Sequence, residues 1–144
     1  MRRLMGLDVG DKTVGVAISD ELGLTAQGVC TVHRQSWAKD LGELGELAKA
    51  NGVSLLVVGL PLNMDGSEGP RAKISRQFAE RASAELGIPA ELWDERLSTA
   101  EVRRVLIAAD VSRKKRKQVV DMLAAQVILQ GYLEAHAARP EAPE

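Results

Sequence analysis

The first third of the chain alternates β-prone segments with turn residues. Residues 4–9 and 13–19 are largely apolar or β-branched and flank the turn Gly10-Asp11-Lys12, a pattern that predicts a hairpin. Residues 24–33 carry β-branched and small side chains between turn-prone flanks. We therefore predict a third strand there, which completes an antiparallel meander.

The middle of the chain changes from a two-residue repeat to a helical one. Ser36 can cap a helix that runs to about Asn51, where Asn51-Gly52 provides a left-handed stop. Residues 53–60 then form a nearly continuous apolar run, so we expect a parallel, central strand buried on both faces. The apolar residues of the helix are spaced to form one face: Trp37, Leu41, Leu44 and Leu47 or Ala48.

The second half of the chain repeats this alternation. A helix is predicted from residue 70 to about residue 87, a short strand over 90–94, and a helix from 98 to about 109 that begins with the capping box Ser98-Thr99-Ala100-Glu101. A last helix, about 118–133, is apolar on most of its circumference and should be deeply buried. The first of these helices is expected to bury Ile74, Phe78, Ala82 and Leu86.

The order of these elements predicts an α/β fold. A mixed five-stranded sheet, antiparallel over its first three strands and parallel afterwards, would be flanked by helices. We assign one domain to residues 1–134 and a disordered acidic tail to residues 135–144, because its prolines, alanines and acids cannot build a core.

Composition narrows the class of protein. The 144 residues are 45% hydrophobic and 27% charged, which fits one globular domain. The single cysteine, Cys30, excludes an intramolecular disulfide framework and a cysteine-rich zinc site. No apolar run is long enough for a signal peptide or a membrane span. We therefore expect a cytoplasmic protein in a reducing compartment, with no membrane partner.

Charge is unevenly distributed along the chain. The formal net charge of -1 argues, taken alone, against a nucleic-acid-binding protein. Aromatic residues are only 3% of the chain, so any recognition would use the backbone and shape of a nucleic acid rather than base stacking. A run of cations before the last predicted helix could contact phosphates, the alternative being a solvated loop: Arg113, Lys114, Lys115, Arg116 and Lys117.

Three carboxylates stand out within the predicted elements. Asp8 lies in an apolar strand, Glu95 follows a short strand, and Asp121 is the only acid inside an apolar helix. Hard oxygen ligands of this kind could hold a divalent cation for phosphoryl chemistry. Each has a structural alternative. Asp8 could accept backbone N–H groups of the following turn, and Glu95 could pair with Arg96 or Arg103. Asp121 could be an acid in the first turn of its helix, where the helix dipole favours negative charge.

A glycine-rich loop over residues 59–70 ends a buried strand and opens a helix, where open α/β sheets bind ligands. Ser67 and the amides at the helix N-terminus could hold a phosphate there. The alternative is an ordinary loop whose glycines satisfy turn geometry.

Four segments, spread over nearly the whole chain apart from the tail, form a combined pattern. They are Gly6-Leu-Asp-Val-Gly-Asp-Lys-Thr-Val-Gly-Val-Ala17, the loop 59–70 with Arg71-Ala72, Asp94-Glu95-Arg96-Leu97-Ser98-Thr99-Ala100-Glu101, and residues 117–133. Together they resemble the YqgF family, also called RuvX, of Holliday junction resolvases with a ribonuclease H-like fold. Members of this family are linked both to cleavage of branched DNA and to trimming of the precursor of 16S ribosomal RNA.

The resemblance implies a metal-dependent nuclease whose acidic site consists of Asp8, Glu95 and Asp121. Mg²⁺ or Mn²⁺ bound there would activate a water for in-line attack on a phosphodiester. Junction cleavage would suit a two-fold homodimer, whereas RNA trimming could proceed from one site. We expect nucleic-acid contacts from the cations 113–117 and from Gly66, Ser67, Arg71 and Arg96.

Two other functions compete with the nuclease. The Asp8-Val9-Gly10 turn also resembles the phosphate loop of sugar kinases and actin-like ATPases, but those folds close two related domains over a nucleotide, and 144 residues supply one. The non-enzymatic alternative is a nucleic-acid-binding or ribosome-assembly factor that keeps the fold without efficient catalysis. The intact trio of acids favours the nuclease.

Overall fold

The structure is a computed structural model that describes residues 3–95 and 113–137, with the side chains of the last helix described from Met122 to His136. In chain order, its elements are β1 (Arg3–Val9), β2 (Thr13–Ser19), β3 (Ala26–His33), α1 (Trp37–Asn51), β4 (Val53–Leu60), α2 (Pro70–Leu86), β5 (Ala90–Asp94) and α4 (Arg113–Ala137).

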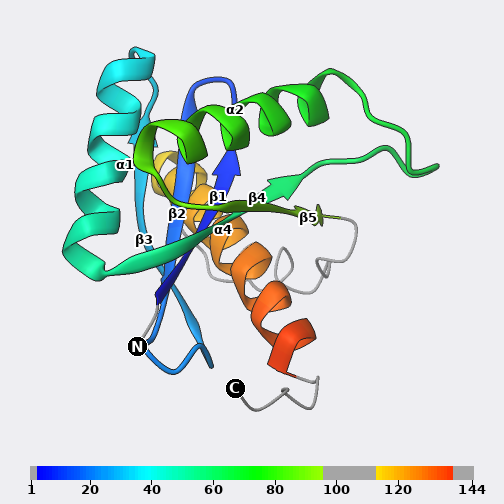
Figure 1. The fold of residues 1–144 in the computed structure, drawn as a ribbon. Coiled ribbons are helices and arrows are strands. Elements are labelled where there is room, and N and C mark those ends of the chain that lie inside the picture. Colours follow the sequence, from blue (N-terminus) through cyan, green and yellow to red (C-terminus); the bar gives the residue numbers. More distant parts are fainter. Residues whose placement is uncertain (1–2, 96–112, 138–144) are drawn as a thin grey trace.

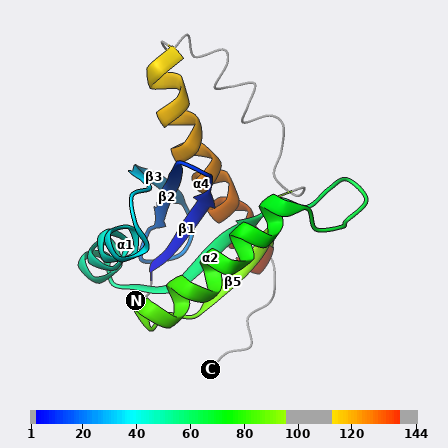
Figure 2. The same ribbon diagram turned by 90° about the horizontal axis from the view of Figure 1, so that it is seen from above.

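One five-stranded sheet organises the molecule, in the order β3-β2-β1-β4-β5. The pairs β1–β2 and β2–β3 are antiparallel, and the pairs β1–β4 and β4–β5 are parallel. Helices α1 and α2 cover one face of the sheet and α4 crosses the other (Figures 1 and 2). The predicted mixed sheet and the parallel strand over residues 53–60 are therefore confirmed.

Side chains that alternate along the strands pack into two hydrophobic cores, one on each face of the sheet. Met5, Leu7 and Val9 of β1 pack in the core under α1 and α2, together with Leu44 and Phe78. The core under α4 contains Ala17, Ala26 and Val57 of the sheet and five buried residues of the helix: Ala125, Ile128, Leu129, Tyr132 and Leu133. Burying each large side chain contributes about 1.5–3 kcal/mol, so both faces of the sheet stabilise the fold.

A row of small residues lets α4 lie directly on the sheet. Gly6, Ala17 and Gly28 are register partners across β1, β2 and β3. An ideal Cβ built on Gly6 would lie 2.7 Å from the Cβ of Leu129. Because only glycine leaves room for this approach, the row fixes where α4 crosses the sheet.

Two glutamines of α4 hydrogen-bond to β3 and show in which direction the helix runs relative to this strand. Gln130 Oε1 accepts the N–H of Ala26 at 2.9 Å, and Gln126 Oε1 accepts the N–H of Gly28 at 3.2 Å. Residue numbers therefore fall along α4 as they rise along β3. Since β1 and β3 are both antiparallel to β2, α4 also runs opposite to β1.

The caps predicted for α1 are present. Ser36 Oγ accepts the N–H of Lys39 at 3.2 Å, and Gly52 has a left-handed φ of 66°. The predicted start of β3 at residue 24 is wrong by two residues. Asp20 Oδ1 accepts the N–H groups of Leu24 and Thr25, at 2.8 and 3.4 Å, which holds these residues in the turn before the strand.

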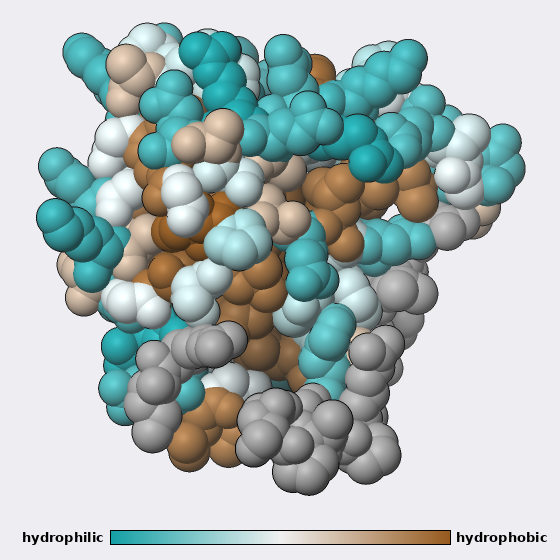
Figure 3. Space-filling view, viewed as in Figure 1, coloured by the Kyte–Doolittle hydropathy of each residue, from teal (hydrophilic) through white to brown (hydrophobic). Residues whose placement is uncertain are grey.

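The predicted face of α2 is partly wrong. Ile74 is 37% exposed, because the helix turns smaller residues to the sheet: Ala72, Ser75, Ala79 and Ala82 accompany Phe78. Figure 3 shows hydrophilic residues over the outer faces of α1 and α2 and hydrophobic residues below α2, along the edge that β5 forms.

The last helix is longer than predicted. It begins at Arg113 instead of residue 118 and extends through Ala137, past the expected domain boundary at residue 134. The predicted helix over 98–109 and tail residues 138–144 lie outside the described residues. Within residues 3–95 and 113–137, no helix combines the length and apolarity needed to cross a membrane.

Candidate active site

Asp8 lies near the carboxyl end of β1, on the face of the sheet that α4 covers. Side chains alternate along a strand, so Asp8 shares this face with Gly6, which contacts α4. Its register partner on β2 is Gly15, and Asp8 itself is partly buried. The predicted apolar surroundings of this carboxylate are thus present, and α4 lies on the same side.

Glu95 follows β5 directly, and its carboxylate lies over Gly59 of β4. An ideal Cβ built on Gly59 would lie 2.6 Å from Glu95 Oε2 and 3.1 Å from Glu95 Cδ. Glycine at this position therefore leaves the space that the Glu95 carboxylate occupies.

The register of β1 and β4 brings Glu95 close to Asp8. Gly6 pairs with Val57 across these parallel strands. Asp8 and Gly59, each two residues further on, therefore share one face of adjacent strands, which run about 4.8 Å apart. The carboxylate over Gly59 thus lies on the strand next to Asp8 and on the same face.

The topology directs residue 121 toward this end of the sheet. Ala125 and Leu129 of α4 lie over Gly6, and α4 runs antiparallel to β1. Residue 121 is one helical turn before Ala125, which is the direction in which β1 continues to Asp8. The side chain of Asp121 lies outside those described. Among the side chains that are described, no group of three His, Cys, Asp or Glu residues could hold a metal ion.

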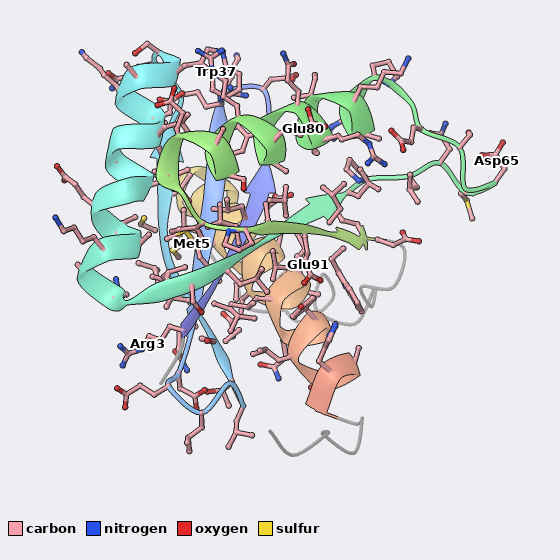
Figure 4. The ribbon with its side chains drawn as sticks, viewed as in Figure 1. Arg3, Met5, Trp37, Asp65, Glu80 and Glu91 are labelled. Atoms are coloured by element: carbon pink, nitrogen blue, oxygen red, sulfur yellow. The ribbon has the colours of Figure 1, made fainter. Side chains whose placement is uncertain are left out.

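The loop between β4 and α2 projects from the body of the molecule, with Asp65 at its far end (Figures 1 and 4). The Gly66 N–H donates to Asn63 O at 2.8 Å. The N–H and hydroxyl of Ser67 both donate to Asp65 Oδ1, at 2.9 and 2.6 Å. A phosphate that bound Ser67 would have to displace Asp65, so the predicted contact competes with hydrogen bonds inside the loop.

Charged residues continue from this loop into α2. Arg76 Nε donates to Glu68 Oε1 at 3.2 Å, and the second guanidinium contact forms an ion pair with the same carboxylate. This hydrogen bond lowers the pKa of Glu68 and raises that of Arg76. Arg71 is exposed in the first turn of α2, next to the loop.

The remaining predicted cations lie at the edge of the described structure. Residues 113–117 form the first turns of α4, so the alternative interpretation of this run as a loop is wrong. Their side chains and all of Arg96 lie outside the described residues.

An aromatic contact between β5 and α4 holds the strand that leads into Glu95. The sequence alone did not indicate this contact. Trp93 packs against the core under α4, with its ring 5.9 Å from that of Tyr132 in an edge-on geometry. The Tyr132 hydroxyl donates to Glu91 Oε1 at 3.0 Å. Both contacts fasten the short strand that ends just before Glu95.

Gly59 was also missed, because the glycines of this segment suggested turn geometry. The available signal was a single glycine inside a buried apolar strand, which indicates a close approach of another group.

Comparison with known proteins gives the same overall assignment. A family model described as "RuvX: Holliday junction resolvase" matches residues 2–135. A protein of Myxococcus xanthus named "Putative pre-16S rRNA nuclease" is 59% identical over 134 residues, which cover 93% of this chain and 89% of the relative. A Symbiobacterium thermophilum protein with the same name is 57% identical over 138 residues, 96% of both chains.

Solved structures share the fold at low sequence identity. The RuvC protein of T. thermophilus, solved in complex with a Holliday junction substrate, matches with a TM-score of 0.57 and 14% identity over 98% of this chain and all of that one. The fowlpox virus Holliday junction resolvase matches with a TM-score of 0.56 and 15% identity over 93% and 99%. The fold is therefore ribonuclease H-like, as expected, and the chain belongs to the RuvX family and is a nuclease, a hydrolase of phosphodiester bonds.

Proposed function

We propose that Asp8, Glu95 and Asp121 together bind Mg²⁺ or Mn²⁺ and form the catalytic site of this nuclease. The observation that carries the proposal is the Glu95 carboxylate over Gly59, on the strand next to Asp8 and on the face that α4 crosses. Carboxylates from a central strand, an edge strand and a covering helix can approach one ion from three sides.

The donor set fits a hard divalent cation. Asp8 and Glu95 supply oxygen ligands, and the partly buried position of both favours ion binding over solvation by bulk water. When bound, the cation supplies a water activated for attack and stabilises the charge on the leaving oxygen. The chain's own residues orient the ligands: β1 carries Asp8, β5 leads into Glu95 over Gly59 of β4, and α4 carries Asp121.

Cations beside the site are proposed to hold the substrate's phosphates. Arg71 is exposed at the start of α2, and residues 113–117 form the start of α4. Both helices begin near the end of the sheet at which β1 and β4 finish. Such contacts position the backbone without reading its sequence. Arg96 and the Gly66-Ser67 turn are weaker contributors, the latter because Asp65 already accepts from Ser67.

The proposed substrate is a precursor of 16S ribosomal RNA. Relatives with 57–59% identity carry a name that specifies this RNA. The family description favours a second candidate, the four-way DNA junction. Cutting a junction symmetrically requires two sites, and hence a homodimer, whereas trimming an RNA end requires one.

Cleavage by Asp8→Asn and Glu95→Gln variants tests the site. Each substitution keeps size and removes the charge, so we expect at least a 100-fold loss of cleavage, on the order of 3 kcal/mol in the barrier, with folding unchanged. Glu46→Gln, an exposed carboxylate of α1 on the opposite face, is the matched control and should cleave normally. Precursor RNA, a four-way junction and linear duplex DNA are compared in Mg²⁺ and Mn²⁺.

The substrate pattern separates the candidates. Cleavage of precursor RNA alone supports RNA maturation, and paired cuts near a junction centre support a resolvase. Full activity of either variant would refute the proposed site. Tight binding of all substrates without any cleavage would favour the binding-factor alternative.

A further inference from the structure

Gly59 is a glycine because of space and not because of backbone conformation. The glycines with positive φ among the described residues are Gly23, Gly52, Gly66 and Gly87, and Gly59 lies within a regular strand. Its register partner on β5 is Trp93, two residues before Glu95. An ordinary side chain could therefore adopt the backbone of residue 59, and something else requires its absence.

Two side-chain ends fill the space above Gly59. An ideal Cβ would lie 2.5 Å from Ile128 Cδ1 and 2.6 Å from Glu95 Oε2. Gly6 differs, because its Cβ would meet the Cβ of Leu129 and, at 2.9 Å, the backbone oxygen of Ala125. A methyl group at residue 6 must displace α4, whereas one at residue 59 displaces only the ends of two flexible side chains.

We propose that Gly59 is a positioning residue for Glu95: its missing side chain forms the seat that holds the Glu95 carboxylate beside Asp8. This inference rests on the proposed function, in which Glu95 binds the metal. A Cβ at residue 59 would lie 2.6 Å from Glu95 Oε2, whereas an ordinary contact needs at least 3.4 Å. The carboxylate oxygen would therefore have to move away by about 0.8 Å. Catalytic groups tolerate displacements of about 0.5 Å, so this shift is large enough to matter.

The Gly59→Ala variant tests the seat directly. We expect cleavage to fall about 10- to 100-fold and Mn²⁺ binding, measured by calorimetry, to weaken about tenfold, while the melting temperature falls by no more than about 10 °C. Gly45→Ala is the matched control, because its Cβ would also crowd a flexible side-chain end, Leu86 Cδ2 at 2.9 Å, but in the core on the other face. It should retain normal cleavage and Mn²⁺ affinity.

Two double variants separate positioning from packing. Ile128→Val removes the other crowded atom, so Gly59→Ala with Ile128→Val should recover stability but not activity. Glu95→Asp shortens the side chain by one methylene. Because both substitutions act on the same carboxylate, the fold-loss of cleavage in Gly59→Ala with Glu95→Asp should be smaller than the product of the two single fold-losses. A purely structural role would give the full product.

Three outcomes would overturn the positioning role. These are wild-type cleavage and Mn²⁺ affinity in Gly59→Ala, full recovery of activity by Ile128→Val, and multiplicative losses with Glu95→Asp. Glu95→Gln, measured in parallel, distinguishes failure of the seat from failure of the proposed metal site. An active Glu95→Gln variant would refute the proposed function itself, whereas an inactive one beside a fully active Gly59→Ala would refute only the seat.

Discussion

At the scale of single residues, glycines serve two separate physical purposes. Gly52 and Gly87 end helices in the left-handed conformation, with φ of 66° and 67°. Gly6 and Gly59 sit in strands and leave room for a helix and for a carboxylate. The first purpose could be predicted from position after a helical repeat. The second is signalled in the sequence only as a close approach at a glycine inside a strand, because the group that approaches comes from another part of the chain.

A single carboxylate also shapes the turn between β2 and β3, and it predicts a pH dependence. The hydrogen bond from the Leu24 N–H, with smaller contributions from Thr25 and Gly23, lowers the pKa of Asp20 below 3.8. A lowered folded-state pKa means that the stabilisation is present above the unfolded value of about 3.9 and is lost as pH falls through the folded value.

We therefore expect this part of the acid destabilisation to be absent from Asp20→Asn. Carboxyl NMR titration of the folded protein should give Asp20 a pKa below 3.8, and a value at or above 3.8 would contradict the turn geometry. Because Asp20 is only partly buried, solvent screens its charge and its contribution to stability should be small.

At the scale of elements, local signals predicted what local physics decides. Ser36 and Gly52 marked the ends of α1 correctly, and the apolar run over 53–60 marked a parallel strand. The face of α2 was less predictable, since Ile74 is exposed while Ser75 is buried against the sheet. Similarly, Asp8 and Glu95 were identified as candidates from their types and places, but their common face follows from the register of β1 with β4.

The cover that α4 places on β3 leads to a prediction of its own. β3 is an edge strand, and unsatisfied edge amides promote pairing with other chains. Gln126 and Gln130 accept two of these amides, and Gln130 Nε2 also donates to Leu24 O at 3.1 Å. Replacing both glutamines with alanine should cost about 1–3 kcal/mol of unfolding free energy and expose the edge.

Denaturant unfolding and sedimentation velocity check this expectation. The double variant should unfold at lower denaturant and self-associate as its concentration rises. Gln77→Ala, an exposed glutamine of α2, is the control and should do neither. A double variant that stayed monomeric at unchanged stability would show that the glutamines do not protect the edge.

At the scale of the whole molecule, the two hydrophobic cores lie on opposite faces of one sheet and share its strands. Successive residues of β1 enter opposite cores, Met5 and Leu7 on one side and Leu4 on the other. The loss of either core therefore exposes one whole face of the same strands. This arrangement couples the face under α4, which carries the proposed site, to the helices α1 and α2 behind the sheet, and small domains of this kind unfold in one step.

The two tryptophans of the chain report on the two cores separately. Trp37 packs near Phe78, with ring centroids 5.6 Å apart, and Trp93 packs under α4. Trp37→Phe leaves Trp93 as the reporter of the core under α4, and Trp93→Phe leaves Trp37 as the reporter of the core under α1 and α2. In each variant, the unfolding curve that the remaining tryptophan reports should coincide with the curve from far-UV circular dichroism. Leu129→Ala removes a fully buried side chain of the α4 core and should cost about 2–5 kcal/mol. Because the sheet is shared, Trp37 should register this loss in full, and Leu44→Ala in the other core should be registered equally by Trp93. If Leu129→Ala shifted the Trp93 transition alone, the two faces would be separate folding units, and damage behind the sheet would leave the face with the proposed site intact.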